Sequence, residues 1–269
     1  MRCPYCGKNV RMGETTCSSC GAPIQQQANE QATQLALSSG IALGGEARRA
    51  RMNADYSDEA LISPRSYNAI LVGTLLWGLL VNAILCVTVG DVYRFINPFL
   101  FLALYLVLAF VGIRVAVKSH NPLISFLGYN MIVVPFGLVI SSMVASYGGI
   151  SSAVVTNAFV YTLLITLGML GAAMAFPEIF AKLGGALAAC LLGMLLCEIV
   201  LLLLGRAQSA TDWIVAGIFS LYIGYDIYRS QRFPMTVDNA VDSALDLYLD
   251  IANLFLRLLR IMSRSKRND

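Results

Sequence analysis

Long apolar runs separated by short polar gaps make up most of the chain after residue 67. There are seven such runs, and each is close to the roughly 20 residues with which a helix crosses the hydrocarbon core of a bilayer. The gaps contain charges and helix breakers, such as Asp91, Pro122 and Pro177, and are short enough for tight turns between antiparallel helices. The runs are 68–89, 98–118, 122–146, 151–176, 183–204, 210–229 and 239–262. The pattern predicts an all-α, polytopic membrane bundle of about seven transmembrane helices.

The composition supports a membrane location. Hydrophobic residues make up 57% of the chain and charged residues 13%, whereas a soluble domain carries about 25% charged residues. So few charges leave too little polar surface to cover a water-facing globule, which argues against a soluble helical bundle. The net charge of +3 is small and no basic face with interleaved aromatics is present, so nucleic acid is not expected as a partner.

The N-terminus lacks the apolar core of a signal peptide, so the first membrane helix is expected to act as the insertion signal. This predicts a multi-pass integral membrane protein whose N-terminal segment is cytosolic, in the plasma membrane if the source is prokaryotic. Basic residues favour the same orientation, since Lys118, Lys182, Arg229 and Arg232 lie in or beside the predicted inner loops. The basic tail, 263–269, would then follow a seventh crossing to the outside, which leaves the side of the C-terminus open.

Four of the chain's 7 cysteines form two CxxC pairs within residues 1–23. Each pair places two thiolates on one turn, and two pairs complete a closed tetrahedral site without an open position for catalysis. We therefore predict a zinc-ribbon module with structural Zn²⁺, while a redox pair or an iron site is the alternative. The predicted ligands are Cys3, Cys6, Cys17 and Cys20. Residues 24–62, rich in Gln, Ala, Ser and Gly, are predicted to form a flexible linker.

The last apolar run, 239–262, contains a narrow polar stripe. At about 100° per residue, its polar residues fall within an arc of about 80°. They are Asp242, Asp246, Asp250, Asn253, Arg257 and Arg260. Such a helix can lie flat on the bilayer with the stripe facing water, or stand inside the bundle with the stripe lining its interior. Ionisable residues in membrane helices indicate function by default, which also draws attention to Glu198 and Asp226.

Two segments resemble the C-terminal signature of the Bax inhibitor family, the transmembrane Bax inhibitor motif proteins. They are residues 219–226, Phe-Ser-Leu-Tyr-Ile-Gly-Tyr-Asp, and residues 244–257, from Ala-Leu-Asp-Leu-Tyr-Leu-Asp to Arg. A weaker similarity extends over 68–262 and leaves the cysteine module out. The resemblance implies a seven-helix domain over 63–262 whose last helix is central and surrounded by the other six, and a protein that is not an enzyme.

The resemblance also implies a pH-sensitive calcium leak channel governed by an aspartate pair, and Asp226 and Asp250 occupy the matching positions. Two carboxylates in contact away from water do not both ionise readily, so they share a proton and titrate as a unit. The shared proton joins the last two helices. Its loss leaves repulsion that helix separation, an arginine or a divalent cation must relieve, and Ca²⁺ suits carboxylate oxygens.

The resemblance further implies an arginine latch near the cytosolic end of the second helix, for which Arg114 is the nearest candidate. Asp246 stands where the family often has Ser, and with Glu198 it is a secondary candidate for a cation site. Arg229 follows Asp226 by three residues, where a neutral residue is common, and is therefore a candidate local counter-charge.

Two other functions remain open. The protein could be a membrane regulator or scaffold that acts through the zinc ribbon. The expected partners are then the lipid bilayer, calcium ions and a protein that binds the ribbon. An intramembrane aspartyl protease also uses two aspartates on neighbouring helices, and Tyr225-Asp226 matches half of its pattern. The other half, Gly-x-Gly-Asp, is replaced by Leu-Tyr-Leu before Asp250.

Overall fold

The structure is a computed structural model that describes residues 19, 61–92, 96–118, 122–204 and 209–268. The predicted zinc ribbon and linker, residues 1–23 and 24–62, lie outside the described residues apart from Ser19, Leu61 and Ile62. The four cysteines predicted to bind zinc lie outside them as well.

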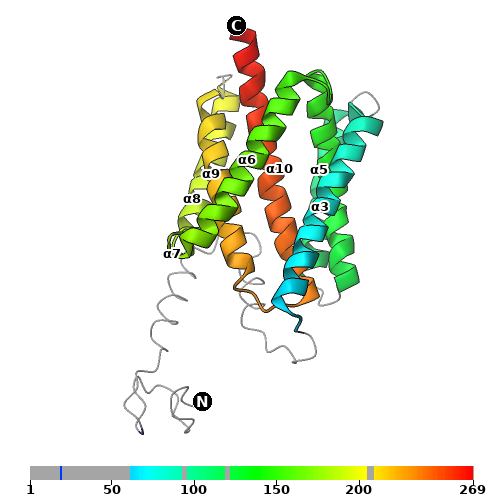
Figure 1. The fold of residues 1–269 in the computed structure, drawn as a ribbon. Coiled ribbons are helices and arrows are strands. Elements are labelled where there is room, and N and C mark those ends of the chain that lie inside the picture. The colour runs from blue at the N-terminus through cyan, green and yellow to red at the C-terminus, as the bar shows by residue number, and fades with distance from the viewer. Residues whose placement is uncertain (1–18, 20–60, 93–95, 119–121, 205–208, 269) are drawn as a thin grey trace. The chain divides into compact units, whose positions relative to one another are not determined.

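Each of the seven apolar runs is a long helix, and one short helix stands between two of them (Figure 1). Within the described ranges the helices are α3 (Pro64–Thr88), α4 (Pro98–Lys118), α5 (Pro122–Ser146), α6 (Ala153–Ala175), α7 (Pro177–Ala181), α8 (Gly184–Leu203), α9 (Ser209–Ser230) and α10 (Val237–Asn268). The short helix α7 occupies the gap at Pro177, where the sequence predicted only a turn. Proline at the first helical position fits a helix start because its missing N–H needs no partner there.

Local sequence signals explain several helix ends. The side chain of Ser63 accepts a hydrogen bond of 3.1 Å from the Ser66 amide, and Pro64 follows as the first residue of α3. At the turn between α5 and α6, Gly148 and Gly149 have φ values of 98° and 78°. These left-handed conformations favour glycine, which has no Cβ.

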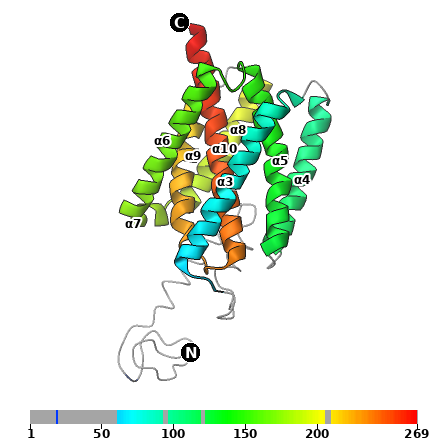
Figure 2. The same ribbon diagram turned by 45° about the vertical axis from the view of Figure 1, so that its right-hand side comes forward.

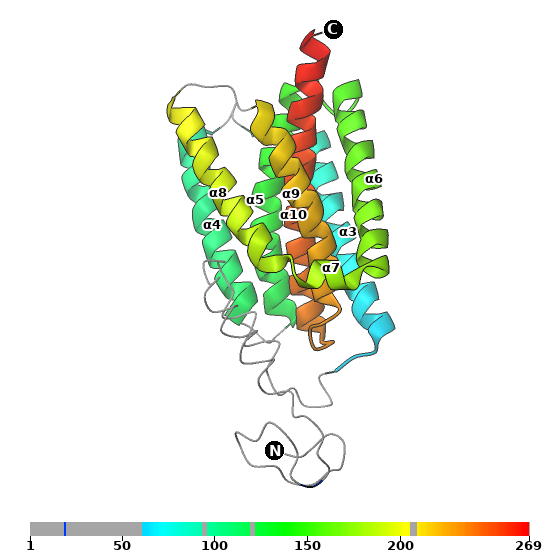
Figure 3. The same cartoon turned by 90° about the vertical axis from the view of Figure 1, so that its left-hand side faces the viewer.

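Helix α10 stands in the centre of the bundle. It packs against α9, α3, α6 and α5, and the views in Figures 1, 2 and 3 show it enclosed by these helices. Tyr248, Leu254 and Leu259 of α10 are fully buried. A helix lying flat on the membrane surface would leave one long face open, whereas α10 has helices packed around it. The polar stripe therefore lies inside the bundle.

The remaining helices form the outer layer, in which α4 packs along α5 and α8 along α9 (Figure 3). Among the described residues, four helices are long and apolar enough to cross a membrane: α3, α5, α6 and α8. They expose many large apolar side chains, such as Leu76, Phe159 and Leu196, which suits contact with lipid. Helix α10 carries more charge, but its neighbours shield it. The fold is therefore the predicted all-α membrane bundle with the last helix central.

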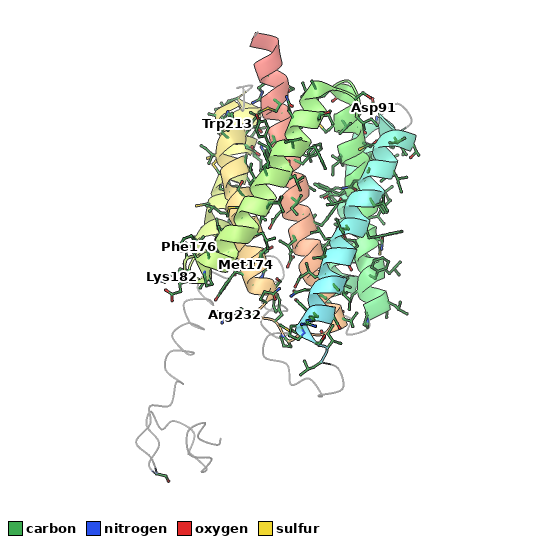
Figure 4. All side chains as sticks on the ribbon, viewed as in Figure 1. Asp91, Met174, Phe176, Lys182, Trp213 and Arg232 are labelled. Carbon is green, nitrogen blue, oxygen red and sulfur yellow. The ribbon has the colours of Figure 1, made fainter. Side chains whose placement is uncertain are left out.

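Consecutive long helices alternate in direction, which gives the bundle two ends. Lys182 and Arg232 lie at the end that contains the turn between α9 and α10, here called the basal end (Figure 4). Asp91 and Trp213 lie at the opposite, distal end. Lys182 and Arg232, two of the basic residues predicted to share one side of the membrane, thus lie at the same end.

Candidate functional site

Asp226 of α9 and Asp250 of α10 meet inside the bundle. The two residues are only 6% and 8% exposed, and their carboxyl groups are in hydrogen-bonding contact. The antiparallel packing of α9 on α10 brings them together, since they are 24 residues apart in sequence. Among the described residues, none donates a hydrogen bond to Asp250 Oδ2. A protonated oxygen would be a donor itself, so this geometry suits one proton shared by the two carboxyl groups.

Arg229 is the counter-charge of this site. Its Nη2 atom lies 2.9 Å from Asp226 Oδ1 and 2.7 Å from Asp246 Oδ2, so one guanidinium joins α9 to α10. The guanidinium also lies near the faces of two aromatic rings, 5.1 Å from the ring centre of Tyr225 and 5.8 Å from that of Phe233. The Arg229 side chain is only 15% exposed, so water screens these contacts weakly.

We call Asp226, Arg229, Asp246 and Asp250 the aspartate cluster. The cluster has three carboxyl groups and a single guanidinium, so it would remain negatively charged even with one shared proton. The cluster therefore keeps an excess of negative charge in a buried position. Such a site attracts cations, and its charge depends on how many protons it holds.

The arrangement is not a ready-made metal site. Across the part of the chain that the structure describes, no group of three or more His, Cys, Asp or Glu side chains is spaced to hold a metal ion. Within the aspartate cluster, the Arg229 guanidinium lies between Asp226 and Asp246 where a cation would otherwise bind. A cation could bind the oxygens of both Asp226 and Asp246 only by displacing Arg229.

The structure does not bring Arg114 to the aspartates. Arg114 is exposed on α4, and its guanidinium lies 4.3 Å from the ring centre of Phe110 on the same helix. Helix α4 packs along α5, in the outer layer of the bundle. Arg229, one turn from Asp226, supplies the positive charge instead. Its spacing of three residues was the sequence signal for this role.

Glu198 is also separate from the aspartate cluster. It forms a bidentate pair with Arg257 of α10, in which Nη2 lies 2.8 Å from Oε2 and Nη1 contacts Oε1. The same Nη1 atom lies 2.9 Å from Oδ1 of Asp212, the first-turn acid of α9. Glu198, which the sequence made a secondary candidate for a cation site, is thus already paired with an arginine.

Asp212 was not recognised from the sequence, although it is a centre of charge pairing. It is fully buried, and three arginines of α10 surround it. Arg264 Nη1 lies 2.7 Å from Oδ2, and Arg260 Nη1 lies 3.5 Å from Oδ1. Its position in the first turn of α9 was the available signal, but a first-turn acid is common at any helix start. We call Glu198, Asp212, Arg257, Arg260 and Arg264 the arginine cluster.

Hydrogen bonds between side chains join α10 to α3 and α5. Asn82 of α3 donates a bond of 2.9 Å to the hydroxyl of Tyr248, and the hydroxyl of Tyr67 lies 3.0 Å from that of Ser243. In addition, Ser125 of α5 donates to Asp238. Contacts of α10 with α3 and α5 are therefore hydrogen bonds, whereas its contacts with α8 and α9 include the ion pairs.

Comparisons with known proteins agree with this architecture. The family model "Inhibitor of apoptosis-promoting Bax1" matches residues 63–268, and a zinc-ribbon domain model matches residues 1–24. Uncharacterized proteins from two strains of Helicobacter pylori are 33% identical to this chain over 86 residues, which is 30% of the chain and 36% of each relative. The match thus spans about a third of those relatives, whose names give no activity. The family match covers the whole bundle, including both charge clusters, and confirms the resemblance seen in the last two long helices: the chain belongs to the Bax inhibitor family.

Proposed function

We propose that the protein is a pH-sensitive calcium leak channel whose gate is the Asp226–Asp250 pair. The observation that carries the proposal is the contact of two buried carboxyl groups from α9 and α10. With a shared proton, the pair joins the two helices and closes the polar face of α10. Family membership supports a membrane protein, and the calcium leak is the activity that the resemblance implies.

Loss of the proton changes both the packing and the charge. Two carboxylates in contact at low dielectric repel each other, and Arg229 already divides its charge between Asp226 and Asp246. The added negative charge favours separation of α9 from α10 and entry of a divalent cation. The proton and Ca²⁺ therefore compete for the same oxygens, and we expect calcium flux to rise as the pH rises through the titration of the pair.

The test is calcium flux into dye-loaded liposomes that contain the full chain, measured across a series of pH values. Asp250→Asn and Asp226→Asn should each remove the pH response, because an amide neither shares nor releases a proton. Glu178→Gln is the matched control, since it removes a carboxylate from an exposed position on α7, outside the aspartate cluster and the polar stripe. Unchanged flux and pH response in both cluster variants would refute the proposal.

The family match to residues 1–24 favours an additional role for the N-terminus. We propose that Cys3, Cys6, Cys17 and Cys20 bind one structural Zn²⁺ and that the folded module, on the cytosolic side of the plasma membrane, docks a protein partner. Four thiolates fill a tetrahedral zinc site, which leaves no position for catalysis. Full-length protein with Cys3→Ser and Cys17→Ser should lose bound zinc by elemental analysis. Retention of one zinc per chain would refute the site.

A further inference from the structure

The polar stripe of α10 is also its accessible face. Between residues 238 and 264, nine positions are partly exposed and the remainder are buried. Seven of the nine fall within about 80° of the helix circumference, at about 100° per residue. These seven are Asp242, Asp246, Leu249, Asn253, Arg257, Arg260 and Arg264. A hydrated cation that moves along α10 would therefore pass these side chains in order.

The sign of the charge changes along this face. The aspartate cluster lies toward the basal end, and the arginine cluster begins at Arg257, seven residues or about 10 Å beyond Asp250. Asn253 is the only polar residue between Asp250 and Arg257 on the stripe. In the arginine cluster, three arginines face two acids and leave one positive charge uncompensated. A cation that has passed the aspartate pair meets this charge next.

Arg257 is bound by two other helices at once. Both of its Nη atoms donate hydrogen bonds to Glu198 of α8, and Nη1 also donates a bond of 2.9 Å to Asp212 of α9. The guanidinium is thereby fixed beside the stripe, and its side chain is 14% exposed. Arg264, by contrast, contacts only Asp212 in this cluster and is 32% exposed.

Helix α8 is attached to the bundle differently at its two ends. Among its described side chains, Leu187 is the only buried one, and it lies near the helix start. There Gly184 lies so close to Tyr225 that a Cβ atom would come within 2.4 Å of the tyrosine hydroxyl. In the distal half, Glu198 is the single charged residue of α8, and its partner is Arg257. In the distal half of α8, Glu198 pairs with Arg257 of α10 and also contacts Thr211 of α9, and Met194 packs against the core.

We propose that Arg257 is a second gate on the cation path, at the distal end of the polar face. While Glu198 and Asp212 bind it, its guanidinium and the adjoining half of α8 close this face toward the distal side. Release of the pair loosens the contact between the distal half of α8 and α10, and it frees the Arg257 guanidinium to move away from the path. The role in cation passage rests on the proposed channel function, whereas the closure can be measured without any flux.

The test uses Asn253→Cys to introduce a reporter thiol between the two clusters. The full chain, with Cys86, Cys190 and Cys197 replaced by Ser, is placed in lipid nanodiscs and treated with a neutral, hydrophilic thiol reagent. Modification of the reporter thiol is followed by peptide mass spectrometry, so that the N-terminal cysteines do not contribute. A neutral reagent is used because its reaction does not respond to local positive charge.

Arg257→Gln should raise the rate of modification of the reporter thiol by about tenfold, the change that about 1.4 kcal/mol of lost closure produces. Arg264→Gln is the matched control: it removes the same charge from the same partner, Asp212, and should change the rate by less than about twofold. Equal rates in the two variants, or no increase with Arg257→Gln, would overturn the proposal. Arg257→Lys keeps the charge without the bidentate geometry and should give an intermediate rate.

Folding of each variant is checked by size-exclusion chromatography. If Arg257→Gln does not fold, Arg257→Lys decides, and a parental rate in that variant overturns the gate. Asp250→Asn separates this proposal from the channel proposal. If Asp250→Asn leaves calcium flux unchanged, the aspartate gate fails, while the effect of Arg257 on the reporter thiol still stands or falls by itself.

Discussion

Replacement of Asp212 by Asn tests whether the arginine cluster stabilises the bundle. Asp212 is fully buried, and Arg264, Arg257 and Arg260 lie 2.7, 2.9 and 3.5 Å from its oxygens. The amide keeps the shape of the side chain and one acceptor oxygen, but it removes the negative charge. Three arginines then face Glu198 alone, and like charges in a weakly screened site repel each other.

The size of the effect follows from the burial of the partners. Removal of one member of a buried ion pair costs roughly 3–5 kcal/mol, because the other charge is left uncompensated. The side chains of Arg257, Arg260 and Arg264 are 14%, 28% and 32% exposed, so water screens part of this penalty. We therefore expect Asp212→Asn to lower the free energy of unfolding by about 3 kcal/mol.

The measurement is unfolding in mixed micelles, followed by tryptophan fluorescence, because Trp213 is adjacent to Asp212. Glu178→Gln is the matched control, since Glu178 is an exposed acid on α7 whose loss should cost less than about 1 kcal/mol. The double variant Asp212→Asn with Arg264→Gln should lose less than the sum of the single changes, because each removes the same contact. Equal stability of Asp212→Asn and Glu178→Gln would refute the reasoning.

Three further outcomes are expected. Arg229→Gln should lower the calcium concentration for half-maximal flux several-fold, because the cation no longer competes with the guanidinium between Asp226 and Asp246. Arg232→Gln replaces an exposed arginine nearby and should leave this concentration unaltered. Gly78→Ala should lower the free energy of unfolding by about 2 kcal/mol, because a Cβ atom there would lie 2.1 Å from the Tyr129 hydroxyl and break its hydrogen bond to the Thr74 carbonyl. Gly73→Ala is the control and should be neutral or stabilising, since no atom lies within 4 Å of the added Cβ. Tyr248→Phe should cost about 1–2 kcal/mol, because the amide of Asn82 loses its acceptor in a buried position, and a thermal unfolding midpoint equal to that of the parent would contradict this.

The sequence by itself determined the secondary structure and the family. The length and hydrophobicity of an apolar run are local properties, and each predicted run therefore became one long helix. Ser63 and Pro64 placed the start of α3 for the same reason, since a helix cap involves only neighbours in the chain. The period of the stripe on α10 was also local, and most of the residues predicted to share one face do share the accessible face of that helix.

The tertiary structure decided which charges meet. A helical period gives the same stripe whether α10 lies on the membrane or inside the bundle, and only packing against α3, α5, α6 and α9 selected the interior. The same holds for the partners: the sequence could not distinguish Arg114 from Arg229 as the aspartates' cation, or show that Glu198 binds Arg257. Ion pairs between helices depend on the register and rotation with which the helices pack, and these are set by the whole core and not by any one segment.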